Sequence, residues 1–235
     1  MGEIADAFRL AFDLMVSLDP ELFAIVSLSL KTSIIAVSIA CVTGFSTGAA
    51  IATLSFTGRR ALLILLNSLM GLPPVVVGLV VYLLLSRSGP FGILGLLYTP
   101  TAMIIAQVIL ITPLVAALSA HHLQELNHEY DEFFRSINLA PGARVKAILW
   151  DGRHKLVSVA LAGFGRAISE VGAVMIVGGN INHVTRIMTT AIALETSKGT
   201  LALALALGII LIVISIAINA AVMLVRSSTK DRSFV

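Results

Sequence analysis

Charged residues are scarce in this sequence. Asp, Glu, Lys and Arg make up 12% of its 235 residues, whereas a soluble domain usually carries about 25%. Such a small share cannot cover a water-facing surface, and 57% of the residues are hydrophobic, so we predict an integral membrane protein. The formal net charge of +3 is too small to indicate nucleic-acid binding.

Cysteine and the common motifs of catalysis are also missing. Cys41 is the only cysteine, which excludes an internal disulfide and a thiolate metal cluster. The sequence has no GxxxxGK[ST] phosphate loop, no HExxH zinc site and no GxSxG nucleophile elbow. The histidines show no ligand spacing supported by carboxylates. We therefore predict no catalytic residue, no metal site and no cofactor in this chain, which counts against a membrane hydrolase.

Five apolar runs are long enough to cross a bilayer as helices, which takes about 20 residues. They cover residues about 24–54, 61–85, 100–120, 157–179 and 200–225. The N-terminal segment, residues 1–21, differs because apolar residues recur there at helical spacing with charges between them. These residues are Ile4, Phe8, Ala11, Phe12 and Met15. We predict an all-α protein with one domain over 24–226, preceded by an interfacial amphipathic helix or a sixth membrane-embedded helix.

The loop charges predict the orientation of the chain. Five spans place three basic segments on one side of the membrane. These segments contain Arg59 and Arg60; Arg135, Arg144, Lys146, Arg153 and Lys155; and Arg226, Lys230 and Arg232. The opposite side has Arg9, Arg87, Arg186 and Lys198. Because basic loops stay in the cytoplasm, we predict a multi-pass protein of the cell membrane with a cytoplasmic C-terminus and an external N-terminus.

The longest polar loop, HEYDEFFRSINLAPGARVKAILWDGRHKL (128–156), predicts two short helices. Apolar residues at i, i+3, i+4 and i+7 form one stripe on the first helix. They are Tyr130, Phe133, Phe134 and Ile137. Asn138 tolerates a left-handed backbone, so we predict a turn there before a second helix that leads to the membrane. Such a surface suits docking of a partner; the alternative is a connecting loop whose stripe lies on the bilayer.

This loop resembles the EAA loop of ABC importer permeases. Asp131 stands at the Glu of that motif, Asn138 at its Gly and Asp151 at its final Pro, while two phenylalanines replace small residues. The resemblance implies that residues 129–151 carry a coupling helix that docks on a cytoplasmic ATPase. The implied coupling residues are Asp131, Phe133, Phe134, Arg135, Ser136, Asn138 and Gly142.

Three further stretches are similar to molybdate and tungstate permeases. They are MGLPPVVVGLVVYLLLSRSGPFG (70–92), GFGRAISEVGAVMIVGGNI (163–181) and TTAIALETSKG (189–199). The segments MIVGGN and ALETSK are closest to the tungstate branch of that family. The resemblance covers residues 24–225.

The resemblance implies a type-1 ABC importer permease fold and a homodimer that moves tungstate inward. ATP and Mg would be bound by a separate ATPase, and an extracytoplasmic oxyanion-binding protein would deliver the cargo. The alternatives are molybdate or sulfate import by the same class of permease, or an ATP-independent secondary transporter or channel.

Two groups of residues within the spans are candidates for the pathway and its gate. Proline removes a backbone donor from a helix, so the second span should be broken or kinked; a plain packing kink is the alternative. In the fourth span, Arg166 and Glu170 lie four residues apart and so share a helix face, which predicts an intrahelical ion pair that gates the pore or stabilises packing. The full set is Gly71, Pro73, Pro74, Gly78, Arg166, Ser169 and Glu170.

A polar loop after the fourth span is the candidate outer mouth. Hydroxyls, amides and a few cations can pass an anion onward without trapping it. The candidates are Asn180, Arg186, Thr189, Thr190 and Lys198. The alternative is an ordinary solvated loop. In the third span, Gln107 and the Thr112–Pro113 pair face either the pathway or a packed interface.

Overall fold

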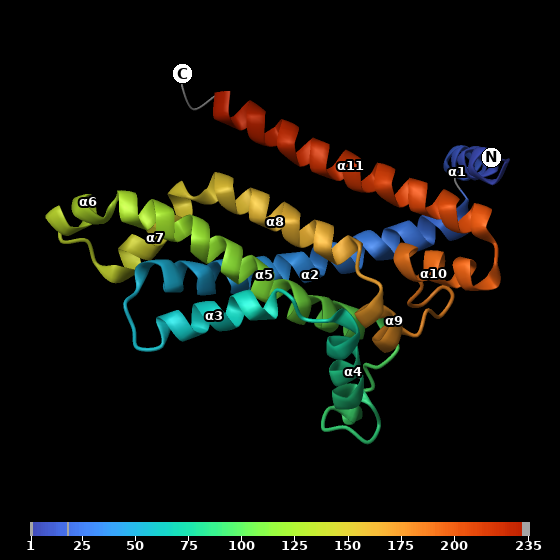
Figure 1. Ribbon diagram of the computed structural model, residues 1–235, viewed down its shortest axis with the longest axis horizontal. Coiled ribbons are helices and arrows are strands. Elements are labelled where there is room, and N and C mark those ends of the chain that lie inside the picture. The colour runs from blue at the N-terminus through green and yellow to red at the C-terminus, as the bar shows by residue number, and fades with distance from the viewer. Residues whose placement is uncertain (1, 18, 232–235) are drawn as a thin grey trace.

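The computed structural model describes residues 2–17 and 19–231. Residues 1 and 18 of the predicted N-terminal segment, and Arg232 of the basic tail, lie outside this range. The described residues form eleven α-helices and one 3-10 helix, and contain no strand (Figure 1). The α-helices are α1 Gly2–Val16, α2 Pro20–Thr53, α3 Arg59–Leu69, α4 Pro74–Leu85, α5 Pro100–Glu129, α6 Asp131–Ser136, α7 Pro141–Asp151, α8 Arg153–Ile168, α9 Gly172–Gly178, α10 Met188–Lys198 and α11 Leu201–Asp231; the 3-10 helix η1 is Gly92–Leu94.

Three helices, α2, α5 and α11, are each long and apolar enough to cross a membrane. The pairs α3–α4 and α8–α9 qualify only when each is counted as one span, and they are bent by 100° and 56° at their breaks. The structure therefore has three to five candidate spans among the described residues. The second and fourth apolar runs of the sequence are each two helices rather than one.

The central contact of the fold is the pairing of α2 with α5, which run side by side along the molecule (Figure 1). Small residues permit this approach. A Cβ atom on Gly44 would lie 2.7 Å from a methyl carbon of Val115, and one on Gly48 would lie 2.9 Å from the amide nitrogen of Ala120. The Ser119 hydroxyl also donates a hydrogen bond to the Gly44 carbonyl at 3.2 Å. Helices α3, α4, α8 and α9 each contact α5 as well, so they pack around the α2–α5 pair.

The long helices define two ends of the molecule, which we call the α7 end and the α10 end (Figure 1). The turn between α2 and α3 lies at the α7 end, as do α6 and α7. Arg59 and Arg60 begin α3 directly after that turn, so they lie at the same end as the basic residues of the loop at 128–156. These two basic segments share one end of the molecule, as the predicted orientation requires, and the side of the membrane that they face stays a prediction.

The N-terminal helix α1 packs on α11 near the α10 end. Ala7 and Ala11 are buried in this contact, while Phe8 and Phe12 are 59% and 63% exposed. The predicted apolar stripe is therefore divided, because its alanine packs on protein and its phenylalanines point outward. Exposed phenylalanines on a helix with charged neighbours are typical of an interfacial helix, and that location remains a prediction.

Candidate functional site

The segment between α5 and α8 forms α6 and α7, which lie at the α7 end of the bundle (Figure 1). Asn138 separates them with a φ of 51°, in the left-handed region, and the next amide, on Leu139, donates to the Phe134 carbonyl at 3.0 Å. The predicted turn is confirmed. Gly142 lies in the first turn of α7, where an added Cβ would meet nothing within 4 Å, so Asn138 makes the turn.

The prediction of a single apolar stripe on α6 is wrong. Phe134 is buried against Leu123 and Ile148, whereas Phe133 is 58% and Ile137 51% exposed. Successive residues on a helix differ by about 100° in direction, and the core here covers the side of Phe134 but not the side of Phe133. Phe134 therefore anchors the segment, and Phe133 and Ile137 remain available to a partner.

A charge cluster joins α6 to α7 and α5. The Arg144 guanidinium donates to an Asp131 carboxylate oxygen at 2.6 Å and to the Asn127 side-chain oxygen at 2.7 Å. Arg135 contacts the other Asp131 oxygen at 2.8 Å but is 76% exposed, against 17% for Arg144. The hydrogen bond from Arg144, assisted by the charge of Arg135, lowers the pKa of Asp131. Asp131 thus holds the segment together, and Arg144, which sequence reasoning left out of the coupling residues, is its main partner.

We expect Arg144→Gln to loosen this segment far more than Arg135→Gln. Arg144 is the shielded partner, and water screens the exposed one. Hydrogen exchange of the amides in 131–151 should become about tenfold faster in the first variant. The lowered pKa of Asp131 predicts that the wild-type protection persists above the unfolded-state pKa and is lost as pH falls through the folded-state value. Equal exchange in the two variants would contradict the assignment.

Proline breaks the second span, as predicted. Pro73 precedes α4 and Pro74 is its first residue, a position where the missing N–H costs nothing. Gly71 and Leu72 continue α3 only through 3-10-type bonds, from their amides to the carbonyls of Ser68 and Leu69, both 3.2 Å. The chain then turns by 100°. The role of this break as a gate stays a prediction.

The two broken spans contact each other where α4 packs on α9 (Figure 1). A Cβ on Gly78 would lie 2.8 Å from the Cα of Ala173, and one on Gly172 would lie 3.0 Å from a Val75 methyl carbon. Glycine is therefore required at Gly78 for the two backbones to meet. The structure thus brings the predicted gate residue of the second span against the half-helix that follows Glu170.

The predicted Arg166–Glu170 ion pair is present at 4.0 Å, but the prediction that both residues lie in one continuous helix is wrong. Helix α8 ends at Ile168, Ser169 caps it, and Glu170 lies in the break before α9. One Glu170 carboxylate oxygen accepts the Ala173 N–H at 3.2 Å, and the other lies 4.0 Å from Arg166 Nε. Glu170 is 6% exposed and the Arg166 side chain 40%. The carboxylate thus satisfies an orphan donor at the start of α9, while Arg166 remains accessible.

Side chains that are distant in sequence donate hydrogen bonds to the backbone carbonyl groups beside this break. The amide of Gln107 donates to the Ala167 carbonyl at 3.1 Å, and the Thr189 hydroxyl donates to the Glu170 carbonyl at 2.8 Å. Gln107 is fully buried, and its side-chain oxygen has no partner among the described residues. Gln107 therefore lies in a packed interface, while the Ser169 hydroxyl bonds back to the Gly165 carbonyl at 2.8 Å.

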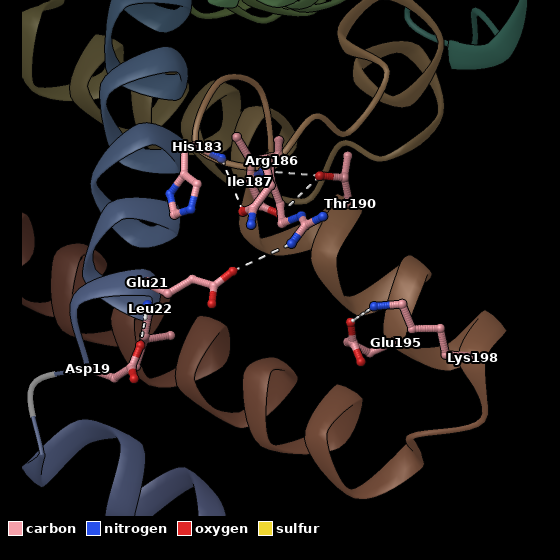
Figure 2. A network of polar contacts seen from close by, with 10 residues as sticks. Asp19, Glu21, Leu22, His183, Arg186, Ile187, Thr190, Glu195 and Lys198 are labelled. Atoms are coloured by element: carbon pink, nitrogen blue, oxygen red, sulfur yellow. Dashed lines mark hydrogen bonds and ion pairs between the residues drawn. The ribbon is translucent and has the colours of Figure 1, made fainter.

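At the α10 end, the predicted outer mouth is more ordered than a solvated loop (Figure 2). Thr189 and Thr190 are buried in α10, and the Thr190 hydroxyl accepts the Ile187 N–H at 3.0 Å. Lys198 pairs with Glu195 at 2.8 Å. Asn180 has a φ of 49° and a buried side-chain oxygen without a partner among the described residues. Most of the predicted mouth residues thus shape the backbone.

Arg186 is the predicted mouth residue whose side chain is best able to bind a further ligand. Its guanidinium lies 3.5 Å from the Glu21 carboxylate, and its Nε is buried without a hydrogen-bond partner among the described residues (Figure 2). It borders a cavity of about 260 Å³ that is also lined by Lys31 and His183. Sequence reasoning missed Lys31, although it is the only charged residue in the run 24–54, and that isolation was the available signal.

Several long apolar helices and two bent helix pairs that pack on each other define a multi-pass membrane protein. The chain belongs to the family of binding-protein-dependent transport system inner membrane components. The sequence profile of this family matches residues 23–231. This family has the type-1 ABC permease fold. The chain is therefore a multi-pass membrane protein of the ABC transporter class.

Individual relatives resemble the chain over most of its length. It is 42% identical to the tungstate uptake system permease protein of Peptoclostridium acidaminophilum, over 94% of this chain and 97% of that protein. The permease protein of the Campylobacter jejuni tungstate uptake system is 36% identical, over 85% of this chain and 83% of that protein. A probable anion ABC transporter permease protein of Haloferax volcanii is 38% identical, over 90% of this chain and 94% of that protein.

Proposed function

We propose that this chain is the permease subunit of an ABC importer that moves tungstate into the cell. The observation that carries the proposal is the 42% identity, over nearly the whole of both chains, to a tungstate uptake permease. Molybdate and sulfate are the alternative cargoes, since they share the tetrahedral oxyanion geometry. The anion transporter relative is compatible with all three.

We place the docking site of the ATPase on residues 129–151. Exposed aromatic residues near charged ones are typical anchors of a protein interface, and Phe133 and Trp150 are 58% and 70% exposed here. The cluster of Asp131 and Arg144 keeps α6 and α7 as one unit, so force applied to Phe133 is transmitted to α5 and α8. ATP and Mg bind to the partner, and the basic α7 end with the C-terminus lies in the cytoplasm.

Two copies of the chain enclose the pathway in this proposal. Helix α4 supports it, because residues along its outer face remain about half exposed although the helix is wholly apolar. They are Val75, Val76, Leu79, Val80 and Leu83. A second copy would cover part of this surface, and lipid the rest. A separate binding protein outside the membrane delivers the anion to the α10 end.

Transport then follows from rocking of the two halves between inward-open and outward-open states. The breaks before α4 and α9 are the candidate gate, since a broken helix bends there without losing further hydrogen bonds. Arg166 is the gate residue best suited to meet the anion, because it is partly exposed and Glu170 is occupied at the start of α9.

The proposal predicts that vesicles containing the permease, its ATPase and its binding protein accumulate tungstate only when ATP is supplied. Energy for import comes from the ATPase, so uptake should stop when that subunit is omitted. The measurement is tungsten retained in the vesicles, determined by elemental mass spectrometry. Equal uptake without the ATPase would favour a secondary transporter or channel. Accumulation of molybdate or sulfate in preference to tungstate from an equimolar mixture would reassign the cargo.

A further inference from the structure

The cavity at the α10 end has one wall from α2 and one from the segment before α10. The α2 wall presents one helix face, because its residues follow at i, i+3, i+4 and i+7. These residues are Ala24, Ser27, Leu28 and Lys31. Asn182, His183 and Arg186 form the facing wall, and Figure 2 shows His183 and Arg186 beside the first turns of α2. At about 260 Å³, the cavity exceeds the ~30 Å³ share of one water molecule several-fold, which is room for a small hydrated anion.

The charges in this cavity are unbalanced toward positive. Lys31 lies eleven residues after Pro20 on α2, which is about 16 Å along the helix axis, and no hydrogen bond or ion pair of its ammonium group is present among the described residues. Arg186 lies 3.5 Å from Glu21 and has a buried Nε without a hydrogen-bond partner in the described chain. Glu195, whose pKa Arg186 helps to lower, lies on its other side in a neighbouring cavity and does not line this one. Two cations and a histidine thus face a single carboxylate. Lys31 is exposed, and an unpaired charge within a membrane span is costly unless a ligand or water meets it.

We propose that this cavity binds a tetrahedral oxyanion during transport, with Lys31 as its exposed cationic contact and Arg186 as its more buried one. The inference rests on the proposed function and adds to it a binding site inside the permease. Arg186 forms forked hydrogen bonds and Lys31 acts as a point charge, and both serve phosphate-like anions. The bound anion competes with Glu21 for Arg186, so the site holds its ligand weakly and releases it inward.

The test is tungstate uptake at saturating tungstate-loaded binding protein, in zwitterionic vesicles that contain the complete permease–ATPase complex. We expect Lys31→Gln to lower uptake about tenfold, the loss of one charge-assisted contact, and Lys31→Arg to restore most of it. Arg9→Gln, which removes an exposed cation outside the cavity, is the matched control and should leave uptake unchanged. ATP hydrolysis stimulated by the binding protein should change less than uptake, since the site acts on the anion and not on docking.

Normal uptake by Lys31→Gln alongside an active wild type would overturn the site and leave the proposed function standing, whereas an inactive wild type would overturn both. Arg186→Gln provides a second variant, and equilibrium dialysis of the complex in lipid nanodiscs against tungstate, without the binding protein, provides a second measurement. The wild type should retain more tungsten than either variant. A phosphate headgroup is the other source of a tetrahedral oxyanion. Dependence on Lys31 only in vesicles containing phosphatidylglycerol would assign the cavity to lipid and overturn the proposal.

Discussion

Phe133→Asp is expected to abolish ATP-driven uptake while the permease itself stays folded. Phe133 is 58% exposed, so its replacement disturbs no packed core. In the docked complex the new carboxylate would be buried in an apolar contact. Loss of an aromatic anchor at an interface costs about 2 kcal/mol or more, which weakens docking by about thirtyfold or more. The measurements are affinity of the purified permease for its ATPase, uptake in vesicles and the thermal unfolding midpoint.

A neighbouring residue supplies the control for this prediction. Glu132→Gln changes an exposed residue on the same helix without adding a charge or removing apolar area, and a contact at the rim of an interface contributes little. Wild-type docking by Phe133→Asp would show that α6 lies against lipid headgroups instead, which is the alternative that the sequence left open. A lowered unfolding midpoint would mean that Phe133, like Phe134, supports the fold.

The two helix breaks show which part of this fold can be predicted from sequence. The break in the second span depends on Pro73 and Pro74, and proline acts through its own covalent structure, so a reader of the sequence can place it. The break in the fourth span follows Ile168 without any proline. Contacts from Gln107 and Thr189, which are 60 and 19 residues away from their acceptors, satisfy the groups it frees. Such contacts are set by the tertiary fold.

The candidate sites also contain some residues that the sequence predicts and others that only the tertiary fold reveals. Helical spacing places Phe133 and Phe134 on a short helix. Spacing alone does not show which side of that helix is covered by the rest of the protein. Asp131 was found through the family motif, while its partner Arg144 is thirteen residues away across a turn. Lys31 was available from the sequence as an isolated charge, and only the cavity beside it shows what that charge faces.

The contact between the two broken spans leads to the second prediction with a large effect. We expect Gly78→Val to lower ATP-driven uptake at least about tenfold and to destabilise the protein by about 1–3 kcal/mol, the usual cost of overpacking. A Cβ at this position would lie 2.8 Å from the Cα and 3.1 Å from the carbonyl oxygen of Ala173. Both are backbone atoms that cannot rotate away, so α4 must move off α9. Uptake in vesicles and the thermal unfolding midpoint measure the two effects.

Gly208→Val is the matched control, because Gly208 lies in α11 and an added Cβ there would meet nothing within 4 Å. Both variants place the same β-branched side chain in an apolar helix, so the helix propensity cost is shared and the difference between them reports the α4–α9 contact. Loss of uptake with a normal unfolding midpoint would mean that the contact matters for the motion of the gate more than for the folded state. Full activity of Gly78→Val would mean that α4 and α9 are apart in the working permease, and the gate would then have to be sought around Arg166.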